Sequence, residues 1–122
     1  MKKLKFRVWD KLEKRYIYPD QGYQGHYILD LNGKFHNLQN GSGGNEYGIE
    51  QFTGVFDKTG KEIYEGDIVR GFMDFGPADF HETNGVISWC DKTHSYQFEY
   101  WNLYSLQVIG NTFETPELRF LN

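Results

Sequence analysis

The sequence predicts a mainly β fold of the β-rich α+β class, and three features of its composition lead to that class. Phe, Trp and Tyr make up 18% of the 122 residues, and aromatic side chains suit the pleated, half-buried surface of a sheet. Alanine, the strongest helix former, occurs once, at Ala78. Glycine occurs 14 times, and it interrupts helices while supplying the turns between short strands.

Two regions are expected, with a glycine-rich segment near their junction. Residues 40–45 read Asn-Gly-Ser-Gly-Gly-Asn, a composition typical of flexible connectors. The segment lacks the Lys-Ser or Lys-Thr ending of a phosphate-binding loop, and no helix pattern follows it. We therefore expect an N-terminal β-hairpin region at residues 1–48 and a small barrel or sandwich at residues 49–122, which could also form one continuous domain.

The N-terminal region contains two predicted hairpins. The first comprises a strand, a turn and a short strand, at residues 4–9, 10–14 and 15–18. In its first strand, Leu4, Phe6 and Val8 alternate with polar or amphipathic residues, as in a half-buried strand. The second hairpin is centred on Asn32-Gly33, which lies between alternating runs. Asn-Gly is the strongest short-range hairpin signal because its turn needs positive φ at both central residues.

The second region reads as short strands separated by turns. The expected strands lie at residues 51–56, 61–64, 68–72, 85–90, 96–101 and 106–111. Residues 74–83 read as an exposed loop, and Thr115-Pro116 is typical of the start of a terminal helical turn. Gly66 is expected to adopt a positive φ between Glu65 and Asp67. The predicted core consists of Phe52, Ile63, Ile68, Val86, Ile87 and Ile109.

Charge and hydropathy exclude several classes. No run approaches the roughly 20 apolar residues of a membrane helix, and the basic start has no apolar stretch behind it, so no signal peptide is expected. The lone cysteine, Cys90, fits a reducing compartment, and we expect a cytoplasmic protein. The net charge is −4, although residues 1–20 hold seven Lys and Arg against three Asp and Glu. A basic end therefore joins an acidic body.

Three blocks of sequence resemble the signature blocks of the YopX family. They lie at residues 5–10, 51–69 and 108–118, in the family's order and over nearly the whole chain. The resemblance implies a phage or prophage origin, a soluble β-rich fold and no assigned activity, cofactor or catalytic residue. It also implies, by analogy of fold alone, an SH3-like small barrel in the second region, because a Gly-Asp turn before an apolar strand recurs in such barrels.

Metal and acid–base chemistry have weak support. Cys90 and His94 form the one pair with metal-ligand spacing, whereas a structural zinc site needs four ligands at paired spacings. Glu62, Glu65 and Asp67 cluster in the middle block, but carboxylates in turns more often cap backbone amides. We therefore expect no metal, no cofactor and no catalytic residue, and hence no enzyme.

The basic N-terminal strand is the candidate binding site. It consists of Lys5, Arg7, Trp9, Lys11 and Arg15. Cations beside aromatic rings are the elements with which proteins bind single-stranded nucleic acid, so these residues are expected to bind nucleic acid or a partner. The same cations could equally be the charged edge strand that protects a sheet from aggregation, in which case the ring of Trp9 packs inside the fold.

Aromatic residues favour a second kind of function. Nine Tyr and three Trp in a chain of this size exceed what its core can hide, and exposed rings favour protein interfaces and ligand pockets. We therefore expect a non-catalytic accessory protein that acts by binding, either on a host or phage protein or by sequestering a small ligand, with nucleic-acid binding as the alternative. A homo-oligomer is also expected, because unpaired edges favour self-association.

Overall fold

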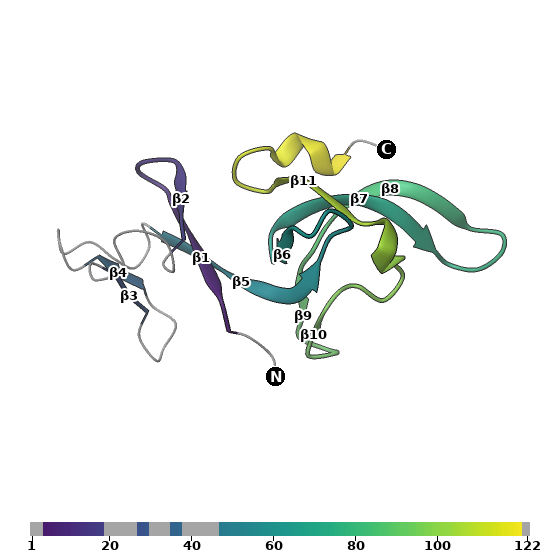
Figure 1. Cartoon of the computed structure of the whole chain (residues 1–122), viewed down its shortest axis with the longest axis horizontal. Helices are drawn as coiled ribbons and strands as arrows, with labels where there is room; N and C mark the ends of the chain where they lie inside the picture. The colour runs from purple at the N-terminus through teal and green to yellow at the C-terminus, as the bar shows by residue number, and fades with distance from the viewer. Residues whose placement is uncertain (1–3, 19–26, 30–34, 38–46, 121–122) are drawn as a thin grey trace. The chain divides into compact units, whose positions relative to one another are not determined.

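The computed structural model describes residues 4–18, 27–29, 35–37 and 47–120, and this part of the chain consists of short antiparallel strands and two 3-10 helices (Figure 1). The predicted mainly β class is therefore confirmed. The chain divides into two compact units, Leu4–Gln51 and Phe52–Asn122. The division lies inside one strand, β5 (Tyr47–Phe56), which also contains the junction expected after residue 48.

The Leu4–Gln51 unit is organised around strand β1 (Phe6–Asp10). It pairs antiparallel with β2 (Arg15–Ile17) on one side and with the first half of β5 on the other. The predicted turn between β1 and β2 is confirmed, since the Asp10 carboxylate accepts hydrogen bonds from the backbone N–H groups of Leu12 and Glu13, both at 3.0 Å. A small core fills one face, formed by Val8, Ile17, Tyr47 and Ile49.

The second predicted hairpin is described in part. Strands β3 (Tyr27–Leu29) and β4 (Phe35–Asn37) pair antiparallel, with Leu29 opposite Phe35. The predicted Asn32-Gly33 turn and the glycine-rich segment at residues 40–45 lie outside the described residues.

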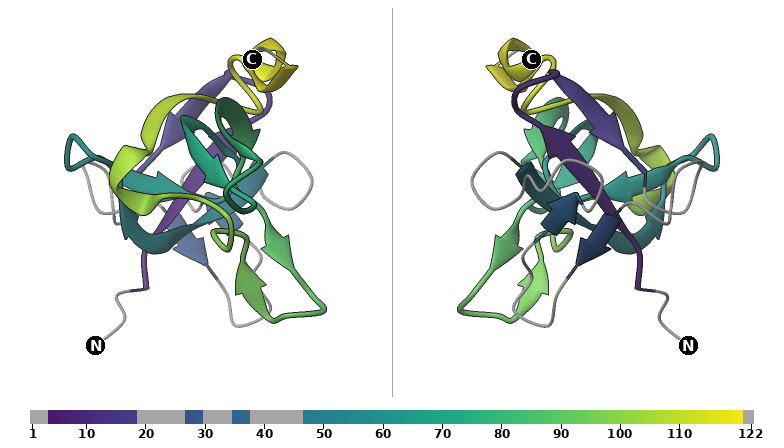
Figure 2. Two further views of the ribbon diagram at one scale, coloured as in Figure 1. Left: turned by 90° about the vertical axis from the view of Figure 1, so that its right-hand side faces the viewer. Right: turned by 90° about the vertical axis from the view of Figure 1, so that its left-hand side faces the viewer.

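The Phe52–Asn122 unit is a curled, strand-rich sheet (Figure 1). Its main strands are β6 (Glu62–Tyr64), β7 (Asp67–Asp74), β8 (Phe80–Val86) and β11 (Gln107–Asn111). β7 is central, with β11 and β8 on its two sides, and the last part of β5 pairs with β6. The short β9 (Trp89–Cys90) and β10 (Ser95–Tyr96) hairpin and the 3-10 helix η4 (Pro116–Phe120) lie at opposite ends of this unit (Figure 2). A second 3-10 helix, η3 (Leu103–Ser105), precedes β11.

The core of this unit is small and aliphatic at its centre. Ile63, Val69, Ile87 and Leu106 are completely buried and pack together, with half-buried aromatic rings around them. Of the predicted core, Phe52, Ile63, Ile68 and Ile87 are buried, so their burial is confirmed, and Ile63 and Ile87 also share the central cluster. The prediction was wrong for Val86 and Ile109, which are half-buried, and it omitted Val69 and Leu106.

Three predicted elements differ from the structure. The loop expected at residues 74–83 is limited to residues 75–79, because β7 and β8 pair as far as Asp74 and Phe80, and the rings of Phe72 and Phe80 stack 5.0 Å apart. The strand expected at residues 85–90 is divided between the end of β8 and β9. The strand expected at residues 96–101 ends at Tyr96. Beyond it, the backbone N–H of Trp101 donates to the Phe98 carbonyl at 3.0 Å, so local turns replace the ladder. The predicted terminal helical turn is confirmed as η4.

Gly66 provides a test of the turn between β6 and β7. Its φ is 86°, as predicted, and its N–H donates to Ile87 at 2.8 Å while its carbonyl accepts from Thr112 at 3.0 Å. A β-branched side chain is strained in this conformation, so Gly66→Val should lower the free energy of unfolding by about 1–3 kcal/mol. Gly66→Asn should lose less, because Asn tolerates positive φ. Thermal melts in which Val and Asn behave alike would contradict this reading.

Candidate functional site

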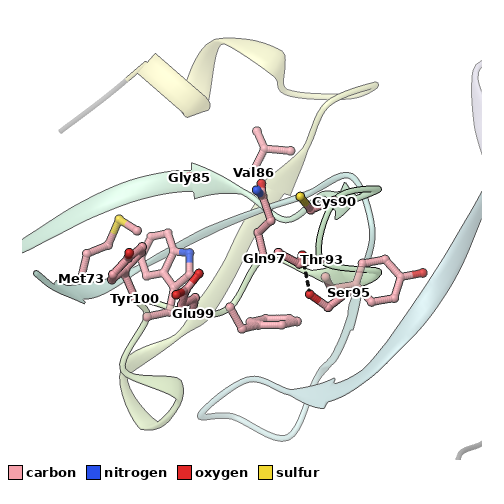
Figure 3. Close-up of a pocket in the computed structure, with 12 residues that line it drawn as sticks. Met73, Gly85, Val86, Cys90, Thr93, Ser95, Gln97, Glu99 and Tyr100 are labelled. Carbon is pink, nitrogen blue, oxygen red and sulfur yellow. Dashed lines mark hydrogen bonds between the residues drawn. The ribbon is translucent and has the colours of Figure 1, made fainter.

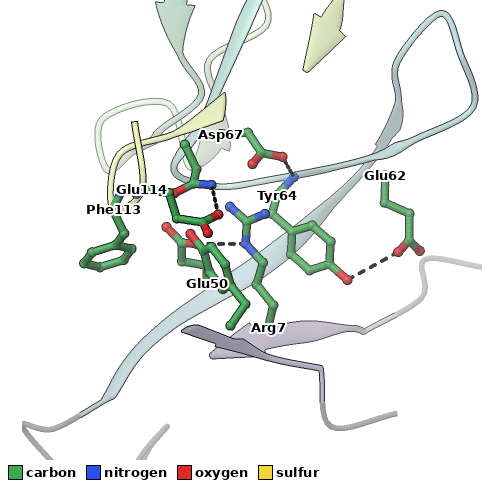
Figure 4. Close-up of polar contacts among 9 residues, drawn as sticks. Arg7, Glu50, Glu62, Tyr64, Asp67, Phe113 and Glu114 are labelled. Atoms are coloured by element: carbon green, nitrogen blue, oxygen red, sulfur yellow. Dashed lines mark hydrogen bonds and ion pairs between the residues drawn. The ribbon is translucent and has the colours of Figure 1, made fainter. Parts of the chain in front are cut away.

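The basic strand is largely occupied by contacts within its own unit. The Arg7 guanidinium is buried and forms an ion pair with Glu50, the residue opposite it on β5, at 2.8 Å (Figure 4). It also lies 4.3 Å from the centroid of the Tyr16 ring, whose hydroxyl donates to the same Glu50 carboxylate at 2.9 Å. A buried charge is tolerated only when it is paired and hydrogen-bonded, and Arg7 meets both conditions.

The other residues of the candidate binding strand are divided between the interior and the surface. Trp9 is buried and meets Tyr16, its cross-strand neighbour, edge-on at 5.0 Å between ring centroids. Lys5 is half-buried, whereas Lys11 and Arg15 are exposed. The structure therefore does not bring the five residues together on one open face. Nor is β1 an edge strand, as the alternative supposed, because it pairs on both sides.

Asp57 is a buried carboxylate with four hydrogen-bond donors around it. One oxygen accepts from the Thr59 N–H at 2.8 Å, the Thr59 hydroxyl at 2.6 Å and the Lys61 N–H at 2.9 Å. The other accepts from the Val108 N–H at 3.0 Å. Burial raises the pKa of this carboxyl, but these hydrogen bonds outweigh burial and hold the pKa below its usual value. The side chain fastens the Asp57 turn to β11.

Two other buried polar residues serve backbone groups in the same way. Asp67 accepts from the Tyr64 N–H at 2.8 Å (Figure 4). The Asn111 side-chain oxygen accepts from the N–H groups of Phe113 at 3.1 Å and Glu114 at 2.8 Å, and its amide donates to the Glu114 carboxylate at 2.8 Å. These contacts are those of turns and caps, and they account for these side chains without a substrate.

A pocket of about 720 Å³ opens between the β7–β8 hairpin and the segment that contains β9 and β10 (Figure 3). Its lining comes from residues 73, 85, 86, 90, 93 and 95–101. The volume lies within the range of small-molecule and side-chain sites. Met73, Glu99 and Tyr100 gather at one end, and Cys90, Thr93 and Ser95 at the other (Figure 3).

The aromatic wall of the pocket depends on a close backbone approach. A Cβ on Gly85 would lie 2.7 Å from the Trp101 ring, closer than carbon atoms approach, so only glycine lets the indole come this near to β8. The backbones of Met73 and Trp101 form an isolated antiparallel β-bridge. The Asp74 N–H also donates to the Tyr100 carbonyl at 2.8 Å. Trp101 and Tyr100 are thus held in place by the β7–β8 hairpin.

The opposite end of the pocket is polar and contains the lone thiol. The Thr93 hydroxyl and the backbone N–H groups of Thr93 and Lys92 lower the pKa of Cys90. His94 adopts a positive φ of 52° in the β9–β10 turn, and His81 makes a 2.8 Å contact with Asp79. Among the described residues, no three or more His, Cys, Asp or Glu side chains are grouped to hold a metal ion.

Comparison with known proteins assigns the chain to a family. The family described as YopX protein matches residues 5–119. The chain belongs to the YopX family. The resemblance noted in the sequence is confirmed over nearly the whole chain. A comparison with curated proteins finds no match.

The YopX chain is also similar to a protein of known structure. The crystal structure of protein EF1440 from Enterococcus faecalis is 26% identical, has a TM-score of 0.59, and covers 97% of this chain and 99% of its own. The similarity therefore extends across both units of the YopX chain. In the described part of the chain, no helix is long and apolar enough to cross a membrane.

The pocket lies outside the three blocks that resemble YopX signatures, and sequence reasoning missed it. The blocks end at residue 69 and resume at residue 108, whereas the pocket lining lies between these positions. The aromatic run from Tyr96 to Trp101 is the available signal, but its alternation predicts a strand and not a pocket wall. By contrast, Asp57, Asp67 and Asn111 lie within the blocks, where they shape turns.

Acid sensitivity tests the role of Asp57. Because its folded pKa lies below the unfolded value of about 3.9, its contribution should be complete above that pH and lost as pH falls through the folded pKa. Asp57→Asn presents an N–H to a buried donor and should cost about 1–3 kcal/mol at pH 7. Denaturant unfolding at pH 7 and pH 3 should show a gap from wild type that narrows at pH 3. Asp91→Asn, in an exposed turn, is the control, and an equal gap at both pH values would refute the assignment.

A pair of substitutions separates packing from binding in the basic strand. Trp9→Ala empties a buried site and should lower the free energy of unfolding by about 3–5 kcal/mol. Lys11→Glu reverses an exposed charge two residues away and should change it by less than about 1 kcal/mol. Urea unfolding measures both. A Trp9→Ala variant as stable as wild type would contradict the packing role and favour Trp9 as a surface binding residue.

Proposed function

We propose that this chain is a non-catalytic phage or prophage accessory protein of the bacterial cytoplasm, and that it acts by binding a protein partner through the pocket beside Trp101. The single observation that carries the proposal is the pocket itself. It is large enough for one or two side chains, its walls are aromatic, and polar groups lie at both ends. Pockets of this composition are the default binding sites of proteins.

Exposed rings beside the pocket extend the binding surface. Tyr100 lines the pocket and also packs against Phe75 at 4.6 Å between centroids. Phe75, Phe80 and Tyr100 are each about half exposed, on or beside the tip of the β7–β8 hairpin. Aromatic residues are enriched at protein interfaces because they bury much area while losing few rotamers. The apolar area next to the pocket favours a macromolecular partner over a small free ligand.

Nucleic-acid binding has less support than a protein partner. Arg7 and Trp9, two of the five residues expected to contact it, are buried in their own unit. Lys11 and Arg15 are exposed, but the segment that forms the pocket is acidic, with seven Asp and Glu against two Lys and Arg in residues 65–101. Phosphate backbones are repelled by such a surface.

Affinity capture from a lysate of a phage-carrying bacterial host tests the proposal. Wild type, Tyr100→Ala and Tyr104→Ala serve as baits, since Tyr104 is 92% exposed but does not line the pocket. A protein retained by wild type and Tyr104→Ala, and lost with Tyr100→Ala, is the expected result. Each capture is repeated after nuclease treatment. Retention that ends with nuclease, or that is insensitive to Tyr100→Ala, would overturn the proposal.

A further inference from the structure

The side chains that line the pocket include a negative charge and no positive charge. No Lys, Arg or His lines the pocket, and Glu99 supplies its one acidic side chain. The Glu99 carboxylate makes no hydrogen bond or ion pair with the described part of the chain. It lies next to Tyr100 at one end of the pocket (Figure 3). An occupant that covered this carboxylate without pairing it would pay the desolvation penalty of an isolated charge.

The aromatic lining favours the same sign of charge. Tyr96, Phe98, Tyr100 and Trp101 all contribute to the wall. The face of an aromatic ring is negative, and Arg or Lys groups within about 6 Å of a ring centroid are attracted to it, most strongly for Trp. Met73 adds a polarizable thioether beside the rings, which suits the methylene stem of a long cationic side chain.

Two charged residues near the pocket, Arg70 and Glu65, also affect its charge. Arg70, on the opposite face of the β7–β8 hairpin, is already held by Glu82 at 2.7 Å and by Asn84 at 2.9 Å. Burial, together with the negative charge of Glu65, raises the pKa of Tyr96 to about 12. The Glu65 carboxylate thus adds a negative charge near the Tyr96 side of the pocket.

We propose that the pocket selects a cationic side chain of the partner protein, an arginine guanidinium or a lysine ammonium, held between the aromatic wall and the Glu99 carboxylate. This inference rests on the proposed function, because it assumes that the pocket is a binding site. Arginine is the preferred occupant, since its planar group stacks on aromatic faces and can donate two hydrogen bonds to one carboxylate. Phosphorylated or acidic segments are rejected by the same groups.

Titration with short peptides tests the inference. Capped pentapeptides that differ only at the central residue, as Arg, Lys, Gln, Leu or Glu, are added to the labelled full chain. The Trp101 indole N–H and the Met73 methyl group are followed by NMR. We expect the Arg peptide to bind about tenfold more tightly than the Gln peptide, the Lys peptide to be intermediate, and the Glu peptide to be weakest.

Matched variants identify the charge responsible. Glu99→Gln should reduce the preference for Arg over Gln several-fold and weaken its dependence on salt, whereas Glu117→Gln removes an equal charge from exposed η4 and should leave both unchanged. Equal effects of the two variants would overturn the inference, as would equal binding of the Leu and Arg peptides. Peptide binding at Trp101 without preference for cations would leave the pocket as a binding site. If no peptide binds while capture of a protein still depends on Tyr100, the inference that a cationic side chain occupies the pocket would also be refuted.

Discussion

The buried Asp57 carboxylate is the constraint on which the Phe52–Asn122 unit depends. It binds the backbone of its own turn and the backbone of Val108, while the Lys58 N–H donates to the Leu106 carbonyl at 2.8 Å. These contacts join the β5–β6 connection to the segment that enters β11. Four aliphatic side chains form the central core, and such a core supplies limited hydrophobic stabilisation. Directional hydrogen bonds from buried polar groups therefore specify the arrangement of the strands.

The YopX scaffold and the candidate binding surface use different parts of the sequence. Within the resembling blocks, Asp57, Asp67 and Asn111 are occupied by backbone hydrogen bonds. The pocket lies between the second and third blocks, on the β7–β8 hairpin and the segment after it. The residues that shape the turns and the residues that line the pocket are therefore separate along the chain.

Local chemistry made much of the fold predictable, and distant contacts account for the rest. The positive φ of Gly66 and the Asp10 turn follow from residues adjacent in sequence. Arg7 was assigned to the surface because its partner, Glu50, is 43 residues away, and an unpaired arginine belongs in water. The pocket depends on Gly85 meeting Trp101, a contact that no local pattern encodes. Residues 74–83 have loop composition, but the β7–β8 ladder includes Asp74 and residues 80–83, beside the stacked rings of Phe72 and Phe80.

The position of Cys90 makes the pocket chemically addressable. It is the one cysteine of the chain, it lines the pocket, and hydrogen bonds from Thr93 and neighbouring backbone groups favour its thiolate, the form that reacts with alkylating reagents and disulfides. A thiol-reactive fluorophore would therefore attach at one known place without any engineered substitution. Occupancy of the pocket could be followed by the rate of that labelling, and weak ligands could be captured there by disulfide exchange.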